Sequence, residues 1–157
     1  MPRYSTYPTL YDEALQISIT KLKVWDYLSP GLRSGTISWH SNGSIIGKIS
    51  ITCDFNEYEP YIKLNYKYGE EPRNYKVRLV STPSNLGKGK IWFFLCPHTQ
   101  KRCRKLYSIG GYFLHREAFT GCMYESQTQS KYYRFLDSTL GRYYKSERLF
   151  SELYSKN

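Results

Sequence analysis

Residues 61–68 read YIKLNYKY, and apolar and polar side chains alternate along this stretch with a period of two. Ile62 and Leu64 fall on one side of an extended chain, while Lys63 and Asn65 fall on the other. Strands of antiparallel sheets show this pattern when one face is packed and the other faces water. The stretch therefore predicts a half-buried antiparallel strand.

Further strands are predicted on both sides of this segment. Residues 36–40, 45–55 and 75–80 are the nearest candidates, and residues 91–95, IWFFL, form a continuously apolar one. The segments between them are rich in Gly, Pro, Asn and Ser, which favour turns. Together these segments predict an antiparallel meander with one buried face.

A helix is predicted before the meander. Leu15, Ile19 and Leu22 have helical spacing within residues 12–28, and Ser29-Pro30-Gly31 is a stop signal.

The chain ends are predicted to differ in structure. Residues 1–8 are interpreted as a loose arm, and residues 126–154 as partly helical. The apolar stripe of this C-terminal helix comprises Leu140, Tyr144, Leu149, Phe150 and Leu153.

Charge is distributed very unevenly. The chain has 23 Lys and Arg against 13 Asp and Glu, a formal charge of +10. Residues 72–116 contain no carboxylate and ten basic side chains, so this segment holds the whole excess. The ten are Arg73, Lys76, Arg78, Lys88, Lys90, Lys101, Arg102, Arg104, Lys105 and Arg116. Such a concentration favours a polyanionic or acidic partner.

Four side chains of the C-terminal half are of the types that bind zinc. Cys96, Cys103, His115 and Cys122 lie within 27 positions. A zinc ribbon usually supplies two C-x-x-C knuckles, but Thr99 and Ala118 occupy the second positions here. We therefore expect no metal or other cofactor, and these four side chains are the ligand set if zinc is bound.

The run FFLCPHTQKRCRKLYSIGGYFLHREAFTGCMYESQTQS resembles part of a group of small bacterial and prophage-borne proteins. In that group a β-rich half precedes a zinc ribbon of the form F-x-C-P-x-C, a basic turn, L-Y, a hairpin, C-R-x-C and Y-x-S-Q. The matching residues here are Phe94, Cys96, Pro97, Lys101, Arg102, Leu106, Tyr107, His115, Arg116, Tyr124, Ser126 and Gln127. The resemblance implies the shape of the ribbon and a link to mobile elements.

The predicted fold class is α+β, mostly β. It comprises an antiparallel meander with an N-terminal helix, a degenerate zinc-ribbon-like hairpin and a C-terminal helix. The hairpin has arms at 101–109 and 111–115. We expect residues 1–90 and 91–157 to form two parts of one compact unit.

Nucleic-acid binding is the chemistry that the basic residues favour. Residues 101–105, KRCRK, are the densest basic run. Basic groups bind phosphates, and neighbouring tyrosines stack on unpaired bases. The candidate partner-binding residues are Lys101, Arg102, Arg104, Lys105, Arg116, Lys88, Lys90, Lys76, Arg78, Tyr107 and Tyr112, with Lys63 and Lys67 on the wet face of the sheet.

Catalysis is not predicted. His40, His98 and His115 are the histidines, and no nucleophile, base and orienting group form a set with them. The glycine-rich stretch 85–90 lacks the spacing of a P-loop. The sequence therefore favours a non-enzymatic binding protein.

Two functional classes follow. The first interpretation is a mobile-element protein that contacts RNA or a ribonucleoprotein and inhibits a host defence complex such as a CRISPR effector. The alternative is an accessory or transcription factor that binds nucleic acid directly, with single-stranded DNA as a further candidate strand. No apolar run is long enough for a membrane span and the first residues lack a signal peptide, so we expect the cytoplasm of a bacterial host.

Overall fold

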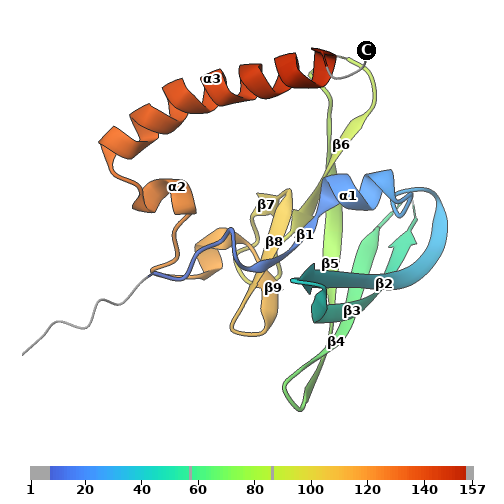
Figure 1. Ribbon diagram of the computed structural model, residues 1–157. Helices are drawn as coiled ribbons and strands as arrows, with labels where there is room; N and C mark the ends of the chain where they lie inside the picture. The colour runs from blue at the N-terminus through green and yellow to red at the C-terminus, as the bar shows by residue number, and fades with distance from the viewer. Residues whose placement is uncertain (1–7, 57, 86, 155–157) are drawn as a thin grey trace, which may run out of the picture. The chain divides into compact units, whose positions relative to one another are not determined.

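The computed structural model describes residues 8–154 except 57 and 86 (Figure 1). Two compact units are present. The larger comprises Glu13–Thr120, and the smaller joins the segment up to Asp12 to the segment from Gly121. The boundary expected between residues 90 and 91 falls at the start of a strand within the larger unit.

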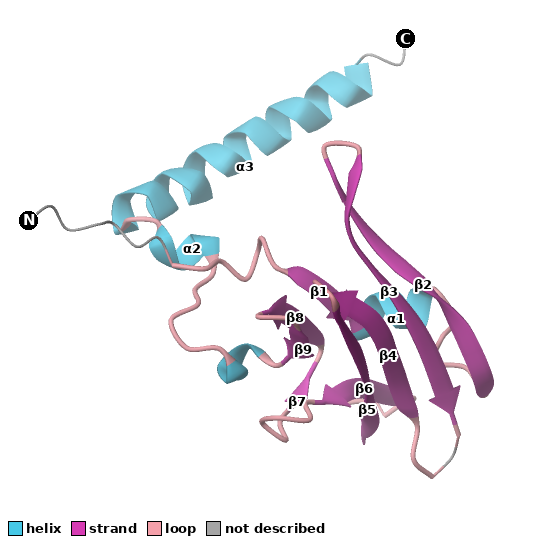
Figure 2. Ribbon diagram, turned by 90° about the horizontal axis from the view of Figure 1, so that it is seen from below, coloured by secondary structure: helices cyan, strands magenta, loops and turns pink. Residues whose placement is uncertain are grey.

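Six antiparallel strands form the main sheet of the larger unit (Figure 2). In spatial order they are β2 (Gly31–Ser41), β3 (Ser44–Phe55), β4 (Tyr61–Tyr68), β5 (Glu71–Pro83), β6 (Lys90–Leu95) and β7 (Arg102–Cys103). Each strand pairs with the next strand in the sequence. The predicted antiparallel, mostly β architecture is therefore confirmed.

A second antiparallel sheet comes from segments far apart in the chain. Its order is β1 (Leu15–Ser18), β8 (Lys105–Ile109) and β9 (Tyr112–Leu114). The pairs Leu15–Ser108 and Ser18–Lys105 set the register of β1 against β8. A short helix, α1 (Ile19–Val24), follows β1, and a 3-10 turn, η1 (Arg116–Ala118), follows β9.

One apolar core joins the two sheets and α1. It contains alternate residues of the main sheet, including Ile62, Leu64 and Phe94, all fully buried. Ile17 and Leu106 contribute from the smaller sheet. Since the intervening residues of β4 are half-buried or exposed, the alternation in residues 61–68 does mark one packed face.

Two tyrosine hydroxyls link the sheets through hydrogen bonds. The hydroxyl of Tyr66, on β4, donates to the carbonyl of Gly111 at 2.7 Å. The hydroxyl of Tyr75, on β5, accepts the N–H of Phe113 at 2.8 Å, and the two hydroxyls lie 3.2 Å apart. The β8–β9 hairpin is thus fixed by both side-chain and backbone groups.

The prediction of a helix over residues 12–28 is wrong in most of its length. Residues 15–18 form β1, and the helix covers Ile19–Val24. Ile17 is β-branched and buried in the ladder with β8, where backbone hydrogen bonds replace those of a helix. Tertiary pairing therefore overrides the helical spacing.

The predicted hairpin around Gly110-Gly111 is confirmed in part. Ile109 pairs with Tyr112 across that turn. The first arm is divided, however, because β7 pairs with β6 in the main sheet whereas β8 pairs with β1. A zinc-ribbon-like hairpin is therefore not confirmed.

The smaller unit contains two helices, α2 (Glu125–Thr128) and α3 (Lys131–Tyr154), so the predicted C-terminal helix is confirmed. In this unit the rings of Tyr11 and Tyr124 lie 4.9 Å apart, and the N–H of Glu125 donates to the Asp12 carboxylate at 2.7 Å.

Parts of the C-terminal prediction lie outside the described structure. Of the predicted apolar stripe, Leu140 is exposed. The other members have side chains outside the described residues: Tyr144, Leu149, Phe150 and Leu153. The predicted arm at residues 1–8 also lies almost wholly outside them.

No helix in the described part of the chain combines the length and the apolar character that a membrane crossing needs.

Gly111 is predicted to tolerate substitution less well than Gly110. Both have positive φ, +92° and +70°, which costs an L residue about 1–2 kcal/mol. A Cβ on Gly111 would also meet the ring of Tyr68 at 2.7 Å, whereas one on Gly110 meets nothing within 4 Å. Gly111→Ala should therefore lower the free energy of unfolding by about 1–3 kcal/mol more than Gly110→Ala, measured by urea denaturation.

A Tyr68→Ala background is the control. In that background the two glycine substitutions should lower the free energy of unfolding by similar amounts, because the Tyr68 ring is absent. An unchanged difference would show that the Tyr68 ring is not the cause.

Candidate nucleic-acid interface

A row of side chains crosses four strands on the face of the main sheet opposite the core. Tyr61 pairs with Arg78, Arg78 with Leu95, and Leu95 with Arg102. Cross-strand partners project from the same face of a sheet, so these four side chains are neighbours. The strand register thus joins residues from β4 to β7 in one line.

Two further pairs flank this row on the same face. Lys63 pairs with Lys76, and Val80 pairs with Phe93. We name the combined surface the cationic sheet face and define it by Lys63, Lys76, Arg78, Arg102, Tyr61 and Phe93. The expected clustering of Lys63, Lys76 and Arg78 follows directly from this register.

Aromatic rings and cations are in contact on the cationic sheet face. The Nζ of Lys76 lies 4.1 Å from the centre of the Tyr61 ring, and the Cζ of Arg102 lies 5.9 Å from that of Phe93. Both distances allow a cation–π attraction. Each contact places a positive charge beside a half-buried ring, Tyr61 or Phe93.

Carboxylates neutralise part of this surface. Glu59 accepts from Arg78 at 3.3 Å, and both side chains are exposed. Asp54 pairs with Tyr61 in the β3–β4 ladder. Within the described residues, Lys63, Lys76 and Arg102 form no ion pair.

The other members of the basic run 101–105 lie away from this face. Lys101 forms an ion pair with Glu117. Arg104 donates to the hydroxyl of Thr20 on α1 at 3.3 Å, and Lys105 belongs to β8 of the smaller sheet. The chain passes from the main sheet to the smaller sheet within this run, so the basic side chains of residues 101–105 lie on different surfaces.

The remaining predicted residues occupy several positions. Lys88 is exposed in the loop between β5 and β6, Lys90 begins β6, and Arg116 is exposed in η1. Lys67 lies near the end of β4, on the face that carries Lys63.

The stacking role predicted for Tyr107 is corrected by the structure. Tyr107 is 6% exposed, because β8 is covered on both faces. Tyr112 is 40% exposed, so its ring remains accessible to a stacking partner. Tyr61 and Phe93, which sequence reasoning did not select as binding residues, are the half-buried rings of the cationic sheet face.

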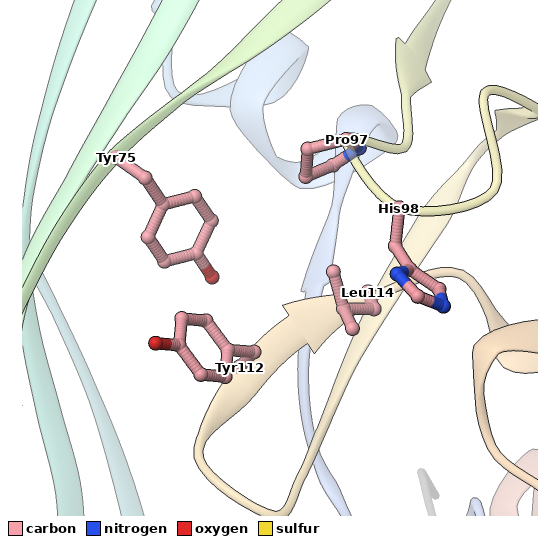
Figure 3. Close-up of a pocket in the computed structure, with 5 residues that line it drawn as sticks. All are labelled: Tyr75, Pro97, His98, Tyr112 and Leu114. Atoms are coloured by element: carbon pink, nitrogen blue, oxygen red, sulfur yellow. The ribbon is translucent and has the colours of Figure 1, made fainter.

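Tyr112 belongs to a separate apolar pocket of about 370 Å³ (Figure 3). The lining residues are Tyr75, Pro97, His98, Tyr112 and Leu114. The Arg73 guanidinium lies 4.4 Å from the centre of the Tyr112 ring and donates to its hydroxyl at 2.5 Å. No pattern along the sequence reveals this pocket, because its walls come from β5, β9 and the β6–β7 turn.

Cys96 is fully buried, and its sulfur is a hydrogen-bond acceptor. The N–H of His115 donates to it at 3.2 Å. Burial raises the pKa of Cys96, but hydrogen bonds from the Thr99 hydroxyl and N–H and from the N–H groups of His115 and His98 outweigh burial and lower that pKa. Burial and the nearby Cys96 raise the pKa of Cys103 to about 12.

This geometry explains what Thr99 does in place of a second knuckle cysteine: it donates to the Cys96 sulfur. Burial lowers the pKa of the His115 imidazole, which favours the neutral ring. Among the described residues, no three His, Cys, Asp or Glu side chains are grouped so as to hold a metal ion. Cys122 belongs to the smaller unit.

The chain matches no family model, no curated protein and no solved structure. The resemblance to small bacterial and prophage-borne proteins therefore stays a prediction.

Cys96→Ala is expected to destabilise the larger unit. It removes the acceptor of the part-buried His115 N–H. A fully buried unsatisfied donor costs about 1–3 kcal/mol, so we expect a loss at the lower end of that range. Cys96→Ser keeps an oxygen acceptor and should cost less. The free energy of unfolding from urea titrations measures both.

Elemental analysis of the wild-type protein distinguishes hydrogen-bond acceptance by the Cys96 sulfur from metal ligation by it. We expect no stoichiometric zinc. One zinc per chain would indicate metal ligation. An equal loss of stability in both variants would show that accepting the His115 N–H is not what Cys96 contributes.

Proposed function

We propose that this protein is a non-enzymatic binding protein whose cationic sheet face holds single-stranded RNA. The observation that carries the proposal is the register that joins Lys76, Arg78 and Arg102 to Tyr61 and Phe93 on one face.

The cations of this face suit a phosphate backbone. Lys63 and Lys76 are directly opposite each other on neighbouring strands, where like charges repel. A phosphate placed between them would relieve this repulsion. Arg102 adds a planar guanidinium that can bind a phosphate through two hydrogen bonds.

The aromatic rings favour unpaired over paired strands. Bases in a duplex are already stacked, whereas unpaired bases gain from stacking on protein rings. Tyr61 and Phe93 each lie beside a basic side chain. Base stacking and phosphate contact are therefore available within a short span of the sheet.

Polar side chains beside the cations favour RNA. Ser50 pairs with Asn65, and Asn65 with Asn74, in the row next to Lys63 and Lys76. Hydroxyl and amide groups can bond the 2′-hydroxyl, which distinguishes RNA from DNA, and can also bond base edges.

The biological setting follows from the resemblance stated above. In this proposal the protein comes from a mobile element, acts in the bacterial cytoplasm, and inhibits a host defence ribonucleoprotein, such as a CRISPR effector, by contacting its RNA. A nucleic-acid-binding accessory or transcription factor would use the same face without a partner protein.

Removing three charges from the cationic sheet face should weaken RNA binding. The sheet-face variant carries Lys63→Gln, Lys76→Gln and Arg102→Gln. Each phosphate contact on a single strand contributes about 0.7 to the slope of log affinity against log salt, so the slope should fall by about 2. Filter binding of a single-stranded oligoribonucleotide at several salt concentrations measures it.

The control variant removes three charges elsewhere, with Lys21→Gln, Lys88→Gln and Lys105→Gln. It should keep most of the affinity and slope. Equal losses in both variants would show that net charge alone, not this face, binds RNA. A cellular complex that survives nuclease and high salt would favour an inhibitor docked on protein.

Tyr61→Ala should weaken binding of unpaired RNA by about 1–3 kcal/mol, the usual value for a base stacked on an aromatic ring. Tyr58→Ala is the matched control, since Tyr58 is 92% exposed in the preceding loop. Fluorescence anisotropy with single-stranded RNA and with an abasic strand of equal length measures both. A Tyr61→Ala loss that is the same on the abasic strand would rule out stacking.

A further inference from the structure

A cavity of about 220 Å³ lies between α1, β6 and the segment joining β7 to β8. Its lining residues are Ile19, Thr20, Lys23, Leu28, Lys90, Ile91, Trp92 and Arg104. The cationic sheet face includes none of these residues. The cavity therefore accounts for basic residues that the proposed RNA surface leaves unexplained.

Three cations from separate segments surround the cavity. Lys23 comes from α1, Lys90 begins β6, and Arg104 lies between β7 and β8. Among the described residues, none that lines this cavity carries a carboxylate. Like charges near one hollow repel each other, and a bound anion would offset that repulsion by attracting each of the three cations.

Backbone and side-chain contacts hold Arg104 at this position. The carbonyl of Arg104 accepts the N–H of Ile19 at 3.0 Å, and its guanidinium donates to the Thr20 hydroxyl at 3.3 Å. Because Ile19 is buried in the core, the segment that carries Arg104 is fixed against α1. The backbone of Arg104 is therefore fixed beside the cavity, and its exposed guanidinium reaches the Thr20 hydroxyl.

The walls strengthen an electrostatic interaction. Leu28, Ile91 and Trp92 are apolar and half-buried. Charges next to such walls are screened less than charges in open water. The volume lies below the roughly 300–1,000 Å³ of sites for drug-sized ligands, so it suits a small group.

We propose that this cavity binds a phosphate group. Arg104 supplies a two-pronged donor, Lys23 and Lys90 supply point charges, and the Thr20 hydroxyl can donate a further hydrogen bond. The phosphate is either a free ion or part of a nucleic-acid strand. Both sources present the same tetrahedral anion to the same side chains.

A neighbouring cavity of about 720 Å³ shares Lys90 and Trp92 and is also lined by Asp54. Lys90 therefore lies between a carboxylate-lined hollow and the cationic one. Arg104 and Lys23 line the cationic hollow without lining its neighbour. In this proposal Arg104 and Lys23 contribute more than Lys90 to the preference of the cavity for phosphate.

The test is calorimetric titration of the full chain with inorganic phosphate at constant ionic strength. We expect saturable binding to the wild type. In the cavity variant, with Lys23→Gln, Lys90→Gln and Arg104→Gln, affinity should fall at least about tenfold, since a hydrogen bond to a charged group contributes about 1.5–3 kcal/mol. An Arg104→Lys variant, which keeps the charge but loses the fork, should fall between the two.

The control and sheet-face variants defined above distinguish phosphate binding at this cavity from attraction of phosphate to the net positive charge of the protein. Both lose three positive charges, and both should bind phosphate as the wild type does. Sheet-face variants that lose RNA but keep phosphate would confirm two distinct sites. Equal loss in all three triple variants, or no saturable binding to the folded wild type, would overturn the proposal.

Oligonucleotides distinguish the source of the phosphate. A 5′-phosphorylated strand that binds the wild type more tightly than its 5′-hydroxyl form, but not the cavity variant, identifies a strand end. If the 5′-hydroxyl strand also loses affinity in the cavity variant, an internal phosphate is the ligand. Inorganic phosphate binding without either effect identifies a free anion. Melting curves of each variant show whether it is folded.

Discussion

The hydrogen bonds of two tyrosine hydroxyls determine how the smaller sheet meets the larger one. Tyr66 donates to the Gly111 carbonyl, while Tyr75 accepts from the N–H of Phe113, within a core that is otherwise apolar. Burial, followed by the hydrogen bond with Tyr66, raises the pKa of Tyr75, so its hydroxyl stays protonated and able to bridge. Apolar packing alone is non-directional, whereas these bonds select one placement of the β8–β9 hairpin. The position of Tyr112 in the apolar pocket depends on that placement.

The placement of the smaller sheet also distributes the basic side chains of residues 101–105 over two surfaces. The main sheet carries Arg102 outward, toward the other cations of the cationic sheet face, and the chain then crosses to the smaller sheet. Arg104 lies on that crossing and is held against α1. A single basic segment of the sequence therefore serves two surfaces of different shape, one open and one concave. In our proposals, the open sheet face binds the bases and backbone of a strand, and the hollow binds a single anionic group.

The alternation of residues 61–68 made the central strands and their buried face predictable, because burial of one face imposes a period of two. The placement of Lys63 and Lys76 on one face follows from the same alternation, whereas their direct pairing is set by the strand register. The strand at Leu15–Ser18 was not predictable from local spacing, since its hydrogen-bond partners lie about ninety residues further along the chain. The burial of Tyr107 was equally hidden, because β8 is packed on both sides and alternation carries no information there.

The pairing of β1 with β8 has a consequence for biosynthesis. Leu15 is made early, yet its ladder partner Ser108 leaves the ribosome only after most of the chain has been synthesised. The meander from β2 to β6 joins sequential neighbours and can assemble while translation continues. During that interval Ile17 lacks its ladder partner Leu106, because β8 is synthesised after the meander. Emergence of β8 and β9, rather than collapse of the first half of the chain, is thus the step that closes the core.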